Sequence, residues 1–337
     1  MDRILTVLLC VLMLTGCGKD TIKDEKIVEE IDEIIIGFSF DTFVFERWQR
    51  DRDVYVSTAK ELGAKVIVQN ANENIKNQIS QIEYFIEKNV DVIVVVPIEP
   101  KSIEDVIYKA HRNGIKIVAY DRMLPNMNSD LYISFDNEKV GKLMAQSVKK
   151  KYPNGGKILY IGGPLSDNNV LLVGSGIKKE LKNSNIEFTN WINLDKWDAK
   201  LASDYVLKNI KELENTDAII CGNDCLAGEV VRVLCENQIA DEKVVIGQDA
   251  DVEACQRIVR GTQYMTVLKQ VELLANEAAI QSVKLAKGEK VDTSLSIYDG
   301  TQQIPYMQLE PVAVIKDNID EEIIDCGYHL REEIYFQ

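Results

Sequence analysis

From residue 34 onward, short runs of β-branched and other apolar residues alternate with longer amphipathic segments. This alternation is typical of βαβ units, in which helices connect parallel strands and cover the sheet. Between the second and third runs, isoleucines recur at spacings of four, three and four (Ile75, Ile79, Ile82 and Ile86), which places them on one helix face. The predicted strands are 34–38, 65–69, 92–96, 117–120, 157–161, 218–221, 244–248 and 265–268.

The length of the chain predicts two domains. A chain of 337 residues exceeds the size at which a single hydrophobic core keeps growing. No Pro- or Ser-rich linker divides the halves, which favours two lobes joined by several ordinary segments. We therefore predict an α/β fold of two doubly wound parallel-sheet lobes joined by a multi-segment hinge. The expected parts are a first lobe of 34–137 plus 271–300, a second lobe of 138–270 plus 301–328, and hinge crossings near 135–140, 269–272 and 298–303. The other predicted helices lie at about 47–62, 102–113, 137–151, 170–184, 199–213, 226–237, 251–260 and 271–287.

The N-terminus has the pattern of a secretory signal. Arg3 precedes an apolar run at 4–14 that is too short to span a bilayer as a helix. The run ends in Leu14, Thr15, Gly16 and Cys17, which resembles a bacterial lipobox with Cys17 as the lipidated residue. We therefore interpret 1–17 as a lipoprotein signal peptide and 18–33 as a polar tether, and expect an extracytoplasmic protein anchored by lipid to the outer face of the cell membrane.

Charge and cysteine content restrict the function. Lys and Arg number 39 against 54 Asp and Glu, a net charge of -15, so nucleic acid is not an expected partner. The cysteines beyond the leader have no repeated CxxC spacing and no nearby His, which favours small, mostly buried apolar residues over a metal site. No metal or cofactor is expected. These cysteines are Cys221, Cys225, Cys235, Cys255 and Cys326.

Polar residues follow most of the predicted strands. Ligands of open parallel sheets bind beyond the carboxyl ends of the strands, so these residues are candidates for a site. Asp and Asn at such positions are also common helix caps, and capping is the favoured interpretation of Asp167, Asp224 and Asp251. Arg and Lys do not cap, and buried cations need a partner or a ligand. The candidates for ligand contact are Arg47, Asp121, Arg122, Asp249 and Lys269.

The candidate residues suit a polyol. Each hydroxyl donates and accepts, so carboxylates together with guanidinium or amide groups can satisfy it. Trp197 could supply an apolar face for sugar C–H groups, although a core position is an equal alternative. Counting Arg47 and Arg50 with the other candidates gives a site charge of about +2, which keeps a sugar acid open as the ligand.

Several segments resemble a known family. Residues 46–53, 119–123, 132–141, 247–251, 261–263 and 265–267 are similar to the D-xylose-binding proteins of bacterial ABC sugar importers, and the resemblance runs from about 34 to 327. It implies the type 1 periplasmic-binding-protein fold and binding of D-xylose or a similar pentose in a cleft that closes between the lobes. Arg50 stands where better-known members carry Lys, and is a further candidate contact. The residues that match the family's sugar contacts are Arg47, Asp121, Arg122, Asn169, Trp197, Asn223, Asp249 and Lys269.

A second resemblance concerns the protein partner. Some clostridial lipoproteins similar to this chain present xylose to a membrane histidine kinase instead of feeding a permease. The expected partner is therefore an ABC permease or the extracytoplasmic domain of a sensor kinase, and the sequence leaves both open.

Two other classes are disfavoured. A pentose isomerase or aldolase needs a placed base, metal or nucleophile, yet His111 is predicted inside a helix and His329 in the tail. The sequence contains no GxSxG, Walker or HExxH motif. A sugar-responsive repressor would need a DNA-reading helix-turn-helix where the apolar leader stands. We therefore expect a binding protein and not an enzyme.

Overall fold

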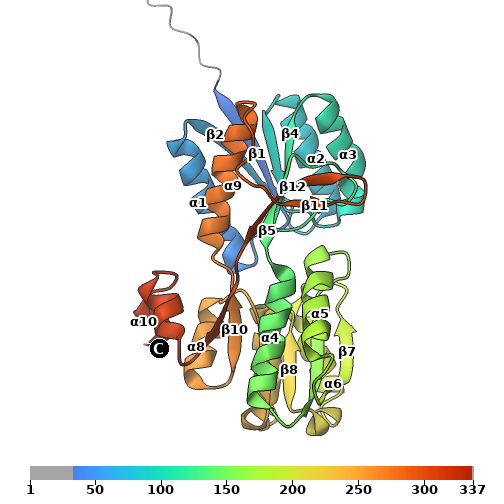
Figure 1. Cartoon of the computed structure of the whole chain (residues 1–337), viewed down its shortest axis with the longest axis vertical. Helices are drawn as coiled ribbons and strands as arrows, with labels where there is room; N and C mark the ends of the chain where they lie inside the picture. The colour runs from blue at the N-terminus through green and yellow to red at the C-terminus, as the bar shows by residue number, and fades with distance from the viewer. Residues whose placement is uncertain (1–32, 336–337) are drawn as a thin grey trace, which may run out of the picture. The chain divides into compact units, whose positions relative to one another are not determined.

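The computed structural model describes residues 33–335, which form two α/β lobes, each built on its own sheet (Figure 1). The segment predicted to be a signal peptide, and all of the predicted tether except Glu33, lie outside the described residues. Among the residues that the structure describes, no helix is both long and apolar enough to cross a bilayer. The fold predicted from the alternating pattern is confirmed.

The first lobe contains a sheet in the order β11-β12-β5-β4-β3-β1-β2. All paired neighbours are parallel except β11 and β12. Its central strands are buried on both faces, which explains their continuous β-branched sequences. The elements are β1 (Ile34–Phe40), α1 (Glu46–Glu61), β2 (Ala64–Asn70), α2 (Ile75–Glu87), β3 (Val92–Val95), α3 (Pro100–Arg112), β4 (Lys116–Tyr120), β5 (Leu131–Phe135), α9 (Val271–Ala286), β11 (Ser296–Tyr298) and β12 (Gln303–Leu309).

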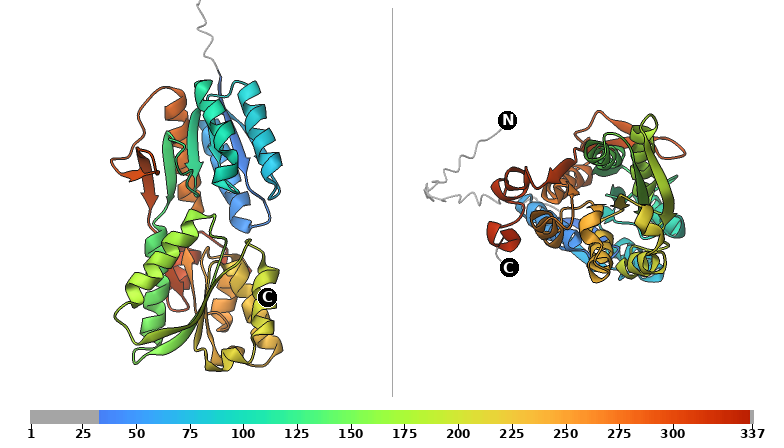
Figure 2. Two further views of the ribbon diagram at one scale, coloured as in Figure 1. Left: turned by 90° about the vertical axis from the view of Figure 1, so that its right-hand side faces the viewer. Right: turned by 90° about the horizontal axis from the view of Figure 1, so that it is seen from below.

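The second lobe contains a sheet in the order β13-β10-β9-β8-β6-β7, parallel except for β13. In both lobes helices lie on both sides of the sheet (Figure 2), and apolar clusters fill the space between. The elements are α4 (Asn137–Lys151), β6 (Gly156–Gly162), α5 (Asn168–Leu181), β7 (Ile186–Asn193), α6 (Ala199–Lys208), β8 (Ala218–Cys221), α7 (Asp224–Glu236), β9 (Val244–Ile246), α8 (Val252–Arg260), β10 (Met265–Leu268), β13 (Val312–Ile315) and α10 (Arg331–Tyr335).

The chain passes between the two sheets at three places. It leaves the first sheet after β5, returns between β10 and α9, and leaves again between β12 and β13. The first two passages fall in the expected segments 135–140 and 269–272. The third lies at 310–311, so the prediction of 298–303 is wrong, and 301–309 belongs to the first lobe because β12 pairs with β5. The pattern of β12 is interrupted by Pro305, which weakens its appearance as a strand.

The cysteine prediction is partly wrong. Cys221 and Cys255 are buried and Cys225 is half-buried, but Cys235 and Cys326 are exposed. All are free thiols. Within residues 33–335, no group of three or more His, Cys, Asp or Glu side chains is placed to hold a metal ion.

Candidate functional site

Polar residues from both lobes surround a small chamber of about 40 Å³. The chamber lies where the carboxyl ends of strands from the two sheets meet, which is the position expected for a ligand in doubly wound folds. Its wall contains three cationic and three carboxylate side chains, together with amides and aromatic rings. The lining residues are Phe45, Arg47, Trp48, Asp121, Arg122, Asp167, Asn169, Trp197, Asn223, Gln248, Asp249 and Lys269.

Arg47, near the start of α1, is held by carboxylates on several sides. Its Nη2 donates to Asp121 Oδ2 at 2.8 Å, and its Nη1 lies 3.7 Å from Asp249 Oδ1 in the other lobe. The guanidinium also lies over the ring of Trp48, 4.1 Å from its centroid. Burial by itself would raise the pKa of Asp121, but the charges of Arg47, Lys269 and Arg122 outweigh it and hold that pKa below its usual range. Asp121 therefore remains a carboxylate in a buried site.

Arg122 connects the two lobes. Its Nη1 donates to Asp41 Oδ2 at 2.6 Å and to the carbonyl of Pro97 at 3.0 Å, and its Nε lies 3.0 Å from Asp167 Oδ2 in the second lobe. All three charged side chains are at most 8% exposed. Burial raises the pKa of Asp167 although Arg122 opposes the shift. A buried cation shared by two carboxylates is well compensated, and it ties the lobes together on one side of the chamber.

Two strand ends at the site have a strained backbone. Asp121 follows β4 with φ 63°, and Asp249 and Ala250 follow β9 with φ 100° and 55°. Asp121 is held by its N–H, which donates to the carbonyl of Ile133, and by its own carbonyl, which accepts from Ser134 Oγ at 2.7 Å. Positive φ in non-glycine residues costs free energy and concentrates at functional sites. The strain turns both carboxylates into the chamber wall.

The second lobe contributes amides and a lysine. Asn169 Nδ2 donates to both the carbonyl and Oδ1 of Asp121 at 3.1 Å, which is a direct bond between the lobes. Asn223 caps α7 through its Oδ1, so its amide nitrogen is the group that remains for a ligand. Lys269 Nζ lies 2.9 Å from Asp249 Oδ1.

Trp197 packs flat against glycine backbone. A Cβ on Gly163 would lie 2.4 Å from the Trp197 ring, and one on Gly222 would lie 3.1 Å from it. The indole Nε1 donates to Asp167 Oδ2 at 3.2 Å. The ring is therefore fixed by its edge and by close packing while it lines the chamber.

The comparisons with known proteins agree with this architecture. A family model described as a periplasmic binding protein domain matches residues 36–290. The D-xylose-binding periplasmic protein of Haemophilus influenzae is 40% identical over 309 residues, covering 90% of this chain and 92% of that protein. The chain belongs to the periplasmic binding protein family.

The D-xylose-binding periplasmic protein of Escherichia coli is 38% identical over 308 residues, covering 90% of this chain and 93% of that protein. Among solved structures, an ABC transporter solute binding protein from Clostridium phytofermentans with bound β-D-glucose has a TM-score of 0.81 at 25% identity, and covers 89% of this chain and 99% of that one.

In this periplasmic binding protein, eight of the nine candidate residues line the chamber; Arg50 does not. Arg50 Nη1 instead donates to Glu272 Oε1 at 3.1 Å and to the carbonyl of Tyr328 at 2.7 Å, and its guanidinium lies over the Tyr328 ring. Removing Arg50 and including Asp167 leaves three cations facing three carboxylates. The site charge of about +2 was therefore wrong, and the lining is balanced.

The capping interpretations have mixed outcomes. Asp167 caps α5, accepting from the N–H of Asn169 at 2.9 Å, and also pairs with Arg122. Asp224 is not a cap; it is buried and accepts from Thr266 Oγ1 at 2.6 Å and Gln263 Nε2 at 2.7 Å. Asp251 occupies the cap position of α8 without a side-chain bond to the helix.

Sequence reasoning missed Trp48 and Gln248 as lining residues. Both are buried, and among residues 33–335 neither Trp48 Nε1 nor Gln248 Oε1 has a hydrogen-bond partner. The available signal was position, because Trp48 adjoins Arg47 and Gln248 adjoins Asp249 at the end of β9. One lobe thus offers an unpaired donor and the other an unpaired acceptor.

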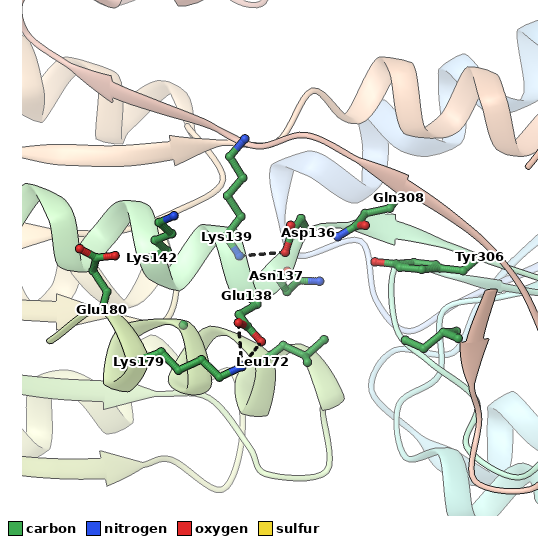
Figure 3. Close-up of a pocket in the computed structure, with 12 residues that line it drawn as sticks. Asp136, Asn137, Glu138, Lys139, Lys142, Leu172, Lys179, Glu180, Tyr306 and Gln308 are labelled. Atoms are coloured by element: carbon green, nitrogen blue, oxygen red, sulfur yellow. Dashed lines mark hydrogen bonds and ion pairs between the residues drawn. The ribbon is translucent and has the colours of Figure 1, made fainter. Parts of the chain in front are cut away.

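A larger hollow of about 630 Å³ lies outside the chamber, where α4 and α5 approach β12 (Figure 3). Two of its charged side chains pair with each other, since Lys179 Nζ donates to both carboxylate oxygens of Glu138 at 2.8 Å (Figure 3). Lys139 pairs with Glu310, which lies outside the lining. None of the nine candidate residues lines this hollow, so the smaller chamber remains the candidate site.

Proposed function

We propose that this protein binds D-xylose in the chamber between its lobes and acts as an extracytoplasmic solute receptor. The observation that carries the proposal is the charge-balanced lining, to which both lobes contribute donors and acceptors. A neutral sugar needs mixed partners and no net charge, whereas a sugar acid would need an excess of cations. The relatives named as D-xylose-binding proteins support the same ligand.

The individual groups match the chemistry of a polyol. Asp121 and Asp249 can each accept from hydroxyls, while Lys269 and the amides of Asn169 and Asn223 can donate to sugar oxygens. Trp48 Nε1 and Gln248 Oε1 are buried groups that would gain a partner from a hydroxyl, and buried polar groups are rarely left unpaired. The Trp197 ring offers an apolar face to C–H groups.

The size of the chamber favours a pentose over a hexose. The chamber has little free volume, about 40 Å³, and the Trp197 ring lies in close contact with Gly163 and Gly222, so this wall cannot move outward. An extra hydroxymethyl group would have to displace one of these walls, and overpacking of this kind costs about 1–3 kcal/mol.

A calorimetric screen tests the ligand. We expect D-xylose to bind the soluble chain tightly, with D-glucose and D-galactose weaker by about tenfold or more, since rejection of one added group is worth about 1–3 kcal/mol. Ribose and arabinose serve as pentose controls for the arrangement of hydroxyls. Absence of heat with xylose, or equal affinity for glucose, would overturn the assignment.

Binding is expected to draw the lobes together. Contacts such as Arg122 to Asp167 and Asn169 to Asp121 exist only when the lobes meet, and a ligand that touches both lobes adds to them. Small-angle X-ray scattering should therefore show a smaller radius of gyration with xylose than without it. An unchanged radius would argue against ligand-driven closure.

The anchor and the protein partner are part of the same proposal. Lipidation at Cys17 would hold the receptor at the outer face of the membrane, beside either an ABC permease or the extracytoplasmic domain of a sensor kinase. Chemical cross-linking of the full-length lipoprotein in membranes, followed by identification of the linked subunit, distinguishes these partners.

A further inference from the structure

Behind Arg47 lies a pair of polar side chains that does not line the chamber. Asp51, one helical turn after Arg47 on α1, is fully buried, and its Oδ2 lies 3.5 Å from Arg47 Nε. Tyr120, the last residue of β4, is also fully buried, and its hydroxyl donates to Asp51 Oδ1. The pair meets the site through Arg47 and through Asp121, which follows Tyr120 in the chain.

These contacts and one peptide bond form a closed ring of four residues. Tyr120 bonds Asp51, Asp51 faces Arg47, Arg47 donates to Asp121, and Asp121 follows Tyr120 in the chain. Arg47 thus faces Asp51 at Nε at ion-pair distance, without a hydrogen bond there, and donates from Nη2 to Asp121 on the chamber side. Its remaining Nη1 is directed toward Asp249 of the other lobe.

A stability role alone does not explain this arrangement. Burying a carboxylate is costly, and buried ionic groups can often be replaced by apolar ones without loss of stability. A guanidinium on a flexible stem, however, needs several fixed partners to occupy one orientation. The ring supplies these partners from two elements, since Asp51 lies on helix α1 while Tyr120 ends strand β4 and Asp121 follows it.

We propose that Asp51 and Tyr120 are positioning residues that set the affinity of the chamber for its sugar by fixing the guanidinium of Arg47. The inference rests on the proposed function for its ligand but concerns residues that do not touch that ligand. Neutralising Asp51 removes the charged partner behind Arg47. The guanidinium can then adopt several orientations and offers the sugar a less well-defined set of donors.

The ring also makes binding sensitive to pH. Burial raises the pKa of Asp51 to about 7, although the charge of Arg47 and the bond from Tyr120 oppose this shift, and Asp121 adds to it. Helix α9, which packs against α1, carries Glu272, and this carboxylate is paired with Arg50. As the pH falls through about 7, Asp51 takes up a proton, so the affinity for sugar should fall in the same range.

The experiment compares isosteric variants by calorimetry with xylose from about pH 5.5 to about pH 8.5. Asp51→Asn should weaken binding about tenfold at the upper pH and flatten the pH profile, and Tyr120→Phe should weaken it by about threefold. Tyr55→Phe is the matched control, because Tyr55 is an equally buried tyrosine of α1 whose hydroxyl bonds neither Arg47 nor Asp51 among the described residues. It should bind as wild type.

Crystal structures of wild type and Asp51→Asn provide a readout that needs no ligand, and should show the Arg47 guanidinium displaced or in several orientations in the variant. Asp224 also has its pKa raised to about 7, so the difference between wild type and variant, and not the wild-type curve alone, is decisive. Wild-type affinity and pH dependence in Asp51→Asn, with Arg47 unmoved, would overturn the inference.

If xylose does not bind wild type, the proposed function fails and the position of Arg47 decides the inference. If Asp51→Asn does not fold, Tyr120→Phe decides it.

Discussion

Replacing Asp121 by alanine is expected to weaken the binding of D-xylose by about 2 kcal/mol or more, a rise in Kd of about 30-fold. Asp121 accepts from Arg47 Nη2 and from Asn169 Nδ2, so its removal leaves buried donors of both lobes without their charged partner. The charges of Arg47, Lys269 and Arg122 hold the pKa of this carboxyl below its usual range, so the group that the variant removes is an ionised one. Titration calorimetry at neutral pH is the direct measurement.

Two further variants separate charge from shape. Asp121→Asn keeps the volume and tolerates the positive φ of 63°, so it should lose affinity through charge alone, whereas alanine adds backbone strain. Asp53→Ala is the matched control, since Asp53 is an exposed residue of the same lobe that pairs with the neighbouring Arg52. It should bind xylose as wild type does. Unchanged affinity in Asp121→Ala would remove this residue from the sugar site.

The fold could be predicted because its strands are buried on both faces. Val92–Val95 and Ala218–Cys221 are continuous apolar runs, and such runs stand out between amphipathic helices. Other strands were missed: β7 is an edge strand with four exposed residues in succession, β12 contains Pro305, and β5 was missed although all of its residues are buried. The strand conformation of such segments depends on hydrogen bonding to a neighbouring strand, and the local sequence does not reveal which strand that neighbour is.

The candidate site was predictable for a similar reason. Parallel strands end at one edge, so Asp121, Asp249 and Lys269 could be expected to converge. Arg50 could not be excluded in this way, because its partners lie 222 and 278 positions away, at Glu272 and Tyr328. Asp167 was underestimated because capping and pairing with Arg122 use different oxygens, and only the structure shows both.

Replacing Arg122 by methionine is expected to have the largest effect, weakening xylose binding by about 100-fold or more. Arg122 pairs with Asp41 and Asp167, and the variant leaves two buried carboxylates without their cation. Removal of one partner from a buried ion pair typically costs about 3–5 kcal/mol. Because Asp167 belongs to the other lobe, part of this free energy is lost from the closed state of the lobes. Closure becomes less favourable, and the affinity for xylose decreases with it.

The pH dependence of stability gives the same variant a second signature. Without the guanidinium, burial raises the pKa of Asp167 still further above that of the unfolded chain. The folded variant then binds more protons than the unfolded one, so its stability falls as the pH rises. Urea unfolding should show the largest deficit relative to wild type near pH 8 and a smaller one toward about pH 5.

Two comparisons make the interpretation of Arg122→Met specific. Arg232→Met also removes an arginine that pairs with two carboxylates of α7, but Arg232 and Glu236 are exposed and Glu229 is partly exposed, and surface pairs of this kind contribute about 0–1 kcal/mol. It should leave binding and the pH profile unchanged. Arg122→Lys keeps the charge but loses the planar fork that reaches Asp41, Asp167 and the Pro97 carbonyl together, so it should recover stability more fully than affinity. If Arg122→Met bound xylose as Arg232→Met does, the lobes would not depend on this ion pair, and closure would have to rest on the other contacts between the lobes, Asn169 to Asp121 and Arg47 to Asp249.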